Sequence, residues 1–207
     1  MYKIDLHVHT SRYSPCSRID PKDLVQTASE AGLDAIVITE HGRMWSRDEV
    51  EELRRSAPTN KLVVLAGAEI YTGRGDILVF GIEETGPLVA AENPETVVSR
   101  THDQGGVAIA AHPTRFGLEF GAEIFHLPLD AIEVMSGNMA SSEWVEAMRI
   151  CEATGVPPVS CSDAHTLGML GGFYTMFDDP IRTETELTIA IKCRRFCAQP
   201  LETGSKR

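Results

Sequence analysis

The sequence predicts a single-domain α/β protein whose strands and helices form a closed or nearly closed barrel. Short apolar runs rich in β-branched residues alternate with amphipathic helical stretches, a pattern typical of parallel strands joined by helical crossovers. In addition, 207 residues, 43% of them hydrophobic, suffice for one well-buried domain and are few for two. We expect a barrel domain over residues 1–200 and a polar tail over residues 201–207.

Seven apolar runs are expected to be strands, and seven strands are enough to close or nearly close a barrel. Each run is short, and polar or glycine-rich turns bound it. The expected strands are Tyr2–His9, Ala35–Thr39, Lys61–Tyr71, Asp76–Ile82, Val107–His112, Ala131–Met135 and Val156–Ser162.

Helices are expected between these strands and after the last one. Asp20-Pro21 is typical of a helix start, with a capping side chain and a first-turn proline, and Gly32 is typical of its end. The long connection Pro113–Leu129 has weak periodicity, and such loops are often functional. The other expected helices run from Ser46 or Arg47 to Arg55 and over Pro94–Gln104, Ser141–Ala153 and Glu184–Phe196.

The charge and the composition narrow the function classes. A formal net charge of −11 repels a phosphate backbone, so we expect no broad nucleic-acid binding and instead a small substrate. No apolar run approaches the roughly 20 residues of a membrane span, and no signal peptide is apparent, which favours a cytoplasmic protein with no membrane partner. The sequence does not predict an oligomeric state.

The five cysteines lack the paired spacing of a structural zinc site. We expect reduced thiols that are mostly buried. Cys193 and Cys197 are expected to share a buried helix face.

Histidines gather at the ends of the expected strands. In a β/α barrel the C-terminal strand ends are where the loops converge, so residues placed there are expected to be neighbours. His7 and His9 alternate on one strand, which turns both side chains to one side, where they can share an ion. Alone, such a pair is also compatible with two half-buried, hydrogen-bonded histidines. The histidines at or just beyond a strand end are His7, His9, His41, His112 and His165.

Carboxylates accompany these imidazoles. Glu69 lies within the third expected strand, and Asp163 stands two residues before His165. Mixed imidazole and carboxylate ligands suit zinc, manganese or iron ions better than calcium or magnesium alone. We therefore expect a transition-metal centre at the mouth of the barrel. His102, within a helix, and His126, on the long loop, are expected to lie outside it.

Six motifs in this order resemble those of the polymerase and histidinol phosphatase (PHP) family. The resemblance spans nearly the whole chain, and the ordered set is far more specific than any member. It implies a distorted seven-stranded β/α barrel, two or three divalent metal ions (zinc, manganese or iron) and hydrolysis of phosphate esters. The motifs are DLHVHT (5–10), ITEHG (38–42), GAEI (67–70), AAHP (110–113), IEVMSG (132–137) and SDAH (162–165).

The resemblance also implies the metal ligands, position by position. It assigns four ligands to a first ion, lets one of them bridge to a second ion, and places two histidines at a third. These are His7, His9, Glu69 and Asp163, with Glu69 bridging to an ion that His112 also binds, and His41 and His165 at the third ion.

Two departures from the family pattern concern the metal sites. Three-metal members carry a further histidine shortly after the paired histidines, and here residues 14–17 read Ser-Pro-Cys-Ser. Cys16 either replaces that histidine as a ligand or is a buried or outer-layer thiol. A histidine that follows the fourth strand in those members is also missing after Asp76–Ile82, which leaves the second site one ligand short.

Arginines near the expected ligands are candidates for gripping a phosphate group. Arg115 is the first candidate because it follows His112 by three residues and a guanidinium suits bidentate phosphate contact. The alternative is a surface arginine on a loop. Arg43 is the second candidate and Arg18 the third.

Four polar residues are expected to support the centre. Glu40 and Asp5 are expected to orient imidazoles as outer-layer carboxylates, Glu40 being a candidate member of the catalytic group. Glu133 and Asn138 are expected to point toward the mouth, where the substrate enters.

The expected function is metal-dependent hydrolysis of a small phosphorylated substrate. Candidate substrates are a nucleotide, a sugar or amino-alcohol phosphate, or the end of a short oligonucleotide. The expected mechanism uses a hydroxide bridging two cations about 3.5–4 Å apart. Two alternatives stay open, because fold and ligands do not settle function. One is hydrolysis of a non-phosphate bond, as in related amidohydrolases, and the other is a non-catalytic metal-binding module.

Overall fold

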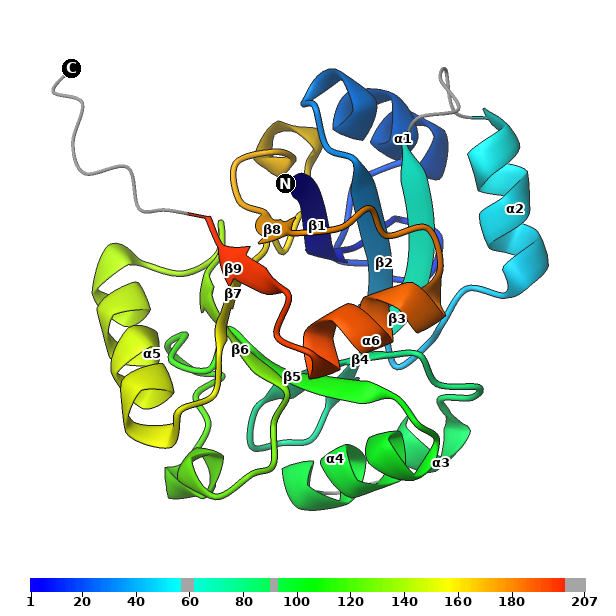
Figure 1. Ribbon diagram of the computed structural model, residues 1–207. Coiled ribbons are helices and arrows are strands. Elements are labelled where there is room, and N and C mark those ends of the chain that lie inside the picture. The colour runs from blue at the N-terminus through cyan, green and yellow to red at the C-terminus, as the bar shows by residue number, and fades with distance from the viewer. Residues whose placement is uncertain (57–61, 90–92, 200–207) are drawn as a thin grey trace, which may run out of the picture.

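A curved sheet of nine strands surrounds the core, in the spatial order β7-β6-β5-β4-β3-β2-β1-β8-β9. The computed structural model describes residues 1–56, 62–89 and 93–199, so the expected tail 201–207 and Lys61 lie outside the described residues. The end strands β7 and β9 come into contact and nearly close the barrel (Figure 1). The strands are β1 Tyr2–Val8, β2 Ala35–His41, β3 Val63–Tyr71, β4 Asp76–Phe80, β5 Val107–Ala111, β6 Ala131–Met135, β7 Pro158–Ser160, β8 Thr175–Phe177 and β9 Phe196–Ala198.

The predicted α/β barrel is therefore confirmed, with its seven expected strands as β1–β7. The strand directions differ from the prediction at β4, which runs antiparallel to both β3 and β5. The reason is the short connection 72–75, because a parallel crossover needs about a dozen residues. The reversal brings the first residue of β4, Asp76, opposite Tyr71 and Ala111, the last residues of its two neighbours.

Most of the helices lie around the outside of the barrel (Figure 1). The predicted starts agree with the structure at Pro21, where Asp20 accepts a hydrogen bond from the Lys22 amide, and at Pro94. In the last helix Thr183 caps the first turn by accepting from the Glu186 amide. The helices are α1 Pro21–Glu30, α2 Arg47–Ser56, α3 Gly86–Val89, α4 Pro94–Asp103, α5 Ser141–Thr154 and α6 Glu184–Lys192, with short 3₁₀ helices η1 Ala122–Phe125 and η2 Leu167–Met169.

The end of α6 differs from the prediction, which extended that helix to Phe196. Arg194 has φ 52°, a left-handed conformation that stops the helix, and Phe196 then begins β9. Cys193 and Cys197 consequently do not share a helix face. Both are exposed, as is Cys16, while Cys151 and Cys161 are buried. The expectation of mostly buried thiols is wrong for these three residues.

Apolar side chains fill the end of the barrel opposite the strand ends that carry the histidines, and α6 closes that end. Leu187 and Ile191 of α6 belong to the same buried cluster as Leu65, Leu78 and Phe80 of the barrel strands. Burying large aliphatic and aromatic side chains contributes roughly 1.5–3 kcal/mol each. The packed interior leaves the other end of the barrel for polar groups. In the described part of the chain, no helix is long and apolar enough to cross a membrane.

Candidate metal centre

The end of β1 places two imidazoles on one side of the strand. His7 and His9 are both fully buried, and their Nε2 atoms lie 3.0 Å apart. Alternation along the strand explains the shared side, as the sequence predicted. Two ring nitrogens at this distance cannot both carry a proton, so at least one electron pair faces the centre.

Two carboxylates stand among these imidazoles. Glu69 of β3 lies with Oε1 3.5 Å from His7 Nε2 and with Oε2 3.2 Å from His9 Nε2. Asp163, after β7, has Oδ1 3.3 Å from His7 Nε2 and 3.4 Å from His9 Nε2. Four side chains from three regions of the chain thus converge on one point, and His7, His9 and Glu69 could hold a cation.

His112, at the end of β5, stands on the inner side of the centre. Its Nε2 lies 3.1 Å from Glu69 Oε1 and 3.8 Å from Asp76 Oδ2. Asp76 is a residue that sequence reasoning missed, because a parallel β4 would have placed it at the other end of the barrel. The signal was the short turn 72–75 before it. Glu69, Asp76 and His112 form a second group that could hold a metal ion.

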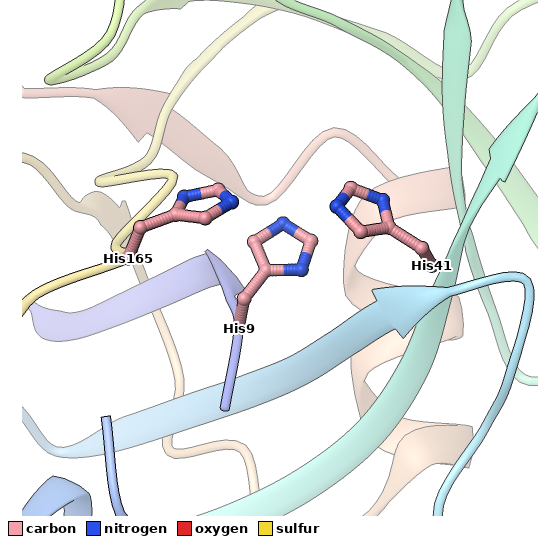
Figure 2. Close-up of side chains that lie close together, drawn as sticks. All are labelled: His9, His41 and His165. Carbon is pink, nitrogen blue, oxygen red and sulfur yellow. The ribbon is translucent and has the colours of Figure 1, made fainter. Parts of the chain in front are cut away.

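His41 and His165 lie on the outer side of the centre, near His9. Figure 2 shows the three imidazoles, each turning one nitrogen toward a shared space. The ring centroid of His9 is 4.4 Å from that of His41 and 4.5 Å from that of His165. The structure therefore brings all seven predicted metal ligands into one cluster, in which these three imidazoles form a further group that could hold a cation.

Two residues of the cluster adopt left-handed backbone conformations. His112 has φ 29° and Asp163 has φ 49°. Such conformations in residues other than glycine cost on the order of 1–3 kcal/mol and are retained mainly at functional sites. We infer that the backbone at His112 and Asp163 is held in a strained conformation because this conformation directs both side chains into the cluster.

The histidines and carboxylates of the cluster shift one another's pKa values toward the charged forms. Burial by itself lowers the pKa of His7, but the charges of Asp163, Glu69 and Glu133 outweigh burial and raise that pKa well above its ordinary value. Burial by itself raises the pKa of Glu69, while the charge of His7 and hydrogen bonds from neighbouring histidines lower it well below the usual range. Protons held by the histidines thus neutralise the carboxylates, a role that bound cations would take over.

Asp76 departs from this pattern. Burial, assisted by the nearby charge of Glu69, raises the pKa of Asp76 to about 6. Its Oδ1 is buried and has no hydrogen-bond partner among the residues that the structure describes. An unsatisfied buried carboxylate oxygen beside two other candidate ligands is suited to binding a cation.

Three of the imidazoles fit metal binding through Nε2, because Nδ1 of each faces a separate partner. Nδ1 of His7 lies 3.3 Å from Glu133 Oε1, and Nδ1 of His9 lies 3.3 Å from Ser14 Oγ. Nδ1 of His165 lies 3.0 Å from the carbonyl oxygen of Asp163. Partners on Nδ1 fix the tautomer and leave Nε2 as the ligand atom, the usual arrangement around bound metals.

Two predicted supporting residues lie elsewhere than expected. Glu133 is buried and binds His7 and the His112 amide instead of pointing toward the mouth. The reason is that it lies within β6 with its side chain facing the barrel. Asp5 accepts hydrogen bonds from the backbone amides of His7 and Ser162 and does not contact an imidazole nitrogen. Burial raises the pKa of Asp5 to about 7.

Glu40 supports the centre through an intermediate hydroxyl. The carboxylate is fully buried and accepts hydrogen bonds from Ser14 Oγ, Thr10 Oγ1 and Trp45 Nε1. Ser14 Oγ in turn faces His9 Nδ1. Glu40 does not line the cavity, and its contacts agree with the expected outer-layer role, while its membership of the catalytic group stays a prediction.

A cavity of about 320 Å³ opens over the cluster. Arg115 lines it and places Nη1 3.4 Å from Asp163 Oδ2, and Asn138 donates to the same oxygen at 2.8 Å. Arg43 is turned away, with its guanidinium 3.7 Å from the Tyr13 ring centroid. The residues lining the cavity are Cys16, His41, Glu69, Asp76, His112, Arg115, Leu118, Asn138, Asp163 and His165.

The remaining histidines lie outside the centre, as predicted. His102 is half-buried and pairs with Asp130 at 2.9 Å, and His126 is exposed at the end of η1. Arg18, the third phosphate candidate, is exposed and does not line the cavity.

Comparisons with known proteins identify the family to which this sequence is similar. The PHP domain model matches residues 5–131, and the PHP-associated model matches residues 145–196. An uncharacterized protein from Methanocaldococcus jannaschii is 31% identical over 145 residues, which are 65% of this chain and 81% of that protein.

Solved structures share the fold. A two-domain protein from Bacteroides vulgatus, containing a predicted PHP-like metal-dependent phosphoesterase, superposes with a TM-score of 0.75 at 20% identity, over 96% of this chain and 64% of its own length. This chain thus spans less than two thirds of that protein. An amidohydrolase from Chromobacterium violaceum, with bound sulfate and no metal, superposes with a TM-score of 0.58 at 16% identity, over 97% and 99% of the two chains. The match of the family model to more than half of the sequence shows that this chain belongs to the PHP domain family.

Proposed function

We propose that the chain is a metal-dependent phosphoesterase that hydrolyses a small phosphorylated substrate. The observation that carries the proposal is the convergence of imidazoles and carboxylates on one small cavity, with an arginine at its rim. Membership of the PHP family supports a metal-dependent hydrolase in general. The choice of a phosphate ester rests on Arg115 and on the cavity.

The cluster offers ligands for up to three cations. His7, His9, Glu69 and Asp163 surround the innermost point, and Glu69 extends to the pair formed by Asp76 and His112. His41 and His165 join His9 on the outer side. Asp76 would supply the ligand that the second site lacks when the family pattern alone is followed. Zinc, manganese and iron ions all accept this mixture of imidazole and carboxylate ligands.

Bound divalent cations supply Lewis acidity and a water molecule acidic enough to react at neutral pH. The protein contributes the geometry. Glu133 and Ser14 hold Nδ1 of His7 and His9, so that the ring orientations are set before a substrate arrives.

Arg115 is the residue proposed to bind the phosphate. Its side chain is 35% exposed and pairs with Asp163 Oδ2 at 3.4 Å, a loose contact that leaves donors free for a ligand. A guanidinium can donate two parallel hydrogen bonds to phosphate oxygens. Asn138 Nδ2, which donates to the same carboxylate, stands beside it and adds a neutral donor.

The size of the cavity and the net charge of the chain favour a small substrate. A cavity of about 320 Å³ admits a phosphate group with a modest organic part. The net charge of −11 disfavours long polyanions but permits the end of a short oligonucleotide. A nucleotide, a sugar phosphate and an amino-alcohol phosphate all meet these limits.

A phosphate-release assay tests the proposal. The protein is stripped with a chelator, reloaded with Mn²⁺, Zn²⁺ or Fe²⁺, and assayed on nucleoside monophosphates, bisphosphates, sugar phosphates and short oligonucleotides. We expect release that depends on the metal and that His9→Ala reduces by at least about 100-fold. His126→Ala, at an exposed position outside the cavity, serves as the control and should keep the wild-type rate.

Two other outcomes of this assay would count against a phosphoesterase. A protein that binds metal and hydrolyses amides or carboxylic esters but none of the phosphate esters would contradict the phosphoesterase proposal. It would favour the amidohydrolase alternative. Metal binding with no hydrolysis of either kind would favour a binding module.

A further inference from the structure

Cys16 stands at the outer side of the metal centre. Its Sγ lies 3.3 Å from Nε2 of His41, and it lines the same cavity as His41 and His165. The sequence left open whether this thiol is a metal ligand or an outer-layer group, and the contacts around it bear on that choice.

The loop that carries Cys16 is tied to the centre on both sides. The Arg18 amide donates to the carbonyl oxygen of His165 at 2.9 Å, and Ser17 Oγ donates to the carbonyl oxygen of His9 at 2.9 Å. The Ser17 amide also donates to the Ser14 carbonyl oxygen at 2.9 Å, which closes a turn around Cys16. The thiol is therefore held beside the histidines by backbone contacts to two of the expected ligand residues.

The imidazoles near this thiol independently point to a cation beside it. Nδ1 of His41 lies 2.9 Å from Glu69 Oε2, while Nδ1 of His9 and of His165 face Ser14 Oγ and the Asp163 carbonyl oxygen. Ser14 Oγ donates its own proton to Glu40, so it can accept from His9 Nδ1. Protons on the three Nδ1 atoms leave three Nε2 electron pairs, and Figure 2 shows the rings turned toward one space.

We propose that the Cys16 thiolate is a donor of an outer cation site, beside the Nε2 atoms of His41 and His165. The Nε2 electron pair of His9, which faces His7 and Glu69, serves the inner ion. The proposal rests on the metal-binding part of the proposed function. When the cation binds, the S–H bond breaks, the proton leaves to solvent, and a metal–sulfur bond forms. Two imidazoles and one thiolate suit a four-coordinate zinc ion whose last position is open to water.

The sulfur donor changes which metal this site accepts. Thiolate ligands favour Zn²⁺, Cd²⁺ and Co²⁺ and contribute little to binding Mn²⁺ or Mg²⁺. The inner group, with only imidazole and carboxylate ligands, lacks this preference. The outer site should therefore fill with zinc even where manganese is in excess.

The test uses a Cys193→Ser/Cys197→Ser background, which removes the other exposed thiols and keeps the buried Cys151 and Cys161. The metal-free protein is titrated with Co²⁺ and followed by absorption spectroscopy. We expect visible bands from cobalt in the imidazole and carboxylate sites together with a near-ultraviolet thiolate-to-cobalt charge-transfer band. Adding Cys16→Ser should remove the charge-transfer band, preserve visible bands, and weaken zinc binding at one site by at least about tenfold.

Alkylation by iodoacetamide gives a second readout that does not depend on catalysis. Stoichiometric Zn²⁺ should slow the labelling of Cys16 strongly, whereas Mn²⁺ should leave it nearly unchanged. Saturation with Co²⁺ that produces visible bands but no charge-transfer band, with labelling unaffected by Zn²⁺, overturns the Cys16 proposal while the metal centre stands. A protein that shows no cobalt bands at all overturns the centre itself and the proposed function with it.

Discussion

Glu133 Oε2 accepts a hydrogen bond from the backbone amide of His112 at 2.7 Å. The other oxygen of the same carboxylate lies 3.3 Å from Nδ1 of His7. One buried side chain of β6 thus sets the positions of ligands from β1 and β5. The positions of the ligand atoms therefore depend on the contacts of Glu133 as well as on the ligand residues themselves.

Glu133→Gln is expected to weaken metal binding by about 10–100-fold, because His7 loses a charged acceptor on Nδ1 while the side-chain volume is kept. Competition with a chromophoric chelator measures the affinity, and circular dichroism checks the fold. The matched control is Glu146→Gln on α5, whose side chain is 55% exposed and is not among the residues that line the cavity. Equal affinities for the two variants would contradict the role given to Glu133.

Asp76→Asn is expected to remove one equivalent of bound metal or to weaken its binding by at least about tenfold, because the second group loses a charged oxygen ligand. Calorimetric titration of the metal-free protein gives the stoichiometry. Asp103→Asn, exposed at the end of α4, is the control. An unchanged stoichiometry and affinity in Asp76→Asn would show that Asp76 is not a ligand and would leave Glu69 and His112 as the ligands of the second site.

Arg115→Ala is expected to raise KM for a phosphate ester by about 10–100-fold, the cost of losing a charge-assisted hydrogen bond. Arg43→Ala should change KM little, because the Arg43 guanidinium packs on Tyr13 outside the cavity. Steady-state kinetics on the best substrate of the panel separates the two arginines. A larger effect from Arg43 than from Arg115 would reverse their assignment.

Glu49 provides a pH-dependent contribution to stability away from the metal ligands. Burial by itself raises the pKa of Glu49, but hydrogen bonds from Tyr13 and Ser46 and the charge of Arg12 together outweigh burial and lower that pKa from 4.5 to about 2. Because the folded-state pKa is lowered, the stabilisation is complete above pH 4.5 and is lost as the pH falls toward 2. Arg12 is 41% exposed, so solvent screens part of the gain.

Glu49→Gln should therefore lower the free energy of unfolding at pH 7 by about 1–2 kcal/mol. The difference from wild type should shrink as the pH falls through this window. Urea unfolding of the metal-free proteins at several pH values measures it, with Glu51→Gln, 52% exposed on the same helix, as the control. A difference that stays constant down to pH 2 would refute the electrostatic explanation.

Much of the centre was predictable because it follows from parallel topology. His7, His41 and His112 stand at or just after the C-terminal ends of parallel strands, and hydrophobic runs identify those ends. Asp76 was missed because β4 is antiparallel and presents its N-terminal end to the mouth. The length of the connection before β4 indicates the direction of that strand, whereas the hydrophobicity of the strand does not.

The C-terminal part was less predictable. The strands β8 and β9 have three residues each, too few for a period-two pattern to be distinguished from a loop. No glycine or proline separates α6 from β9, so the helix was extended too far. Glu133 was expected to point toward the mouth, because the direction of a carboxylate inside a barrel strand depends on a register that tertiary packing decides.

The most direct test of the account is the metal content of the purified protein, measured by elemental analysis and checked by titration of the chelator-stripped chain. The account predicts at least two equivalents of transition metal per chain, and a marked loss in both His7→Ala and Glu69→Gln. Less than one equivalent under saturating zinc or manganese, or wild-type content in both variants, would contradict the claim that this cluster is a metal centre.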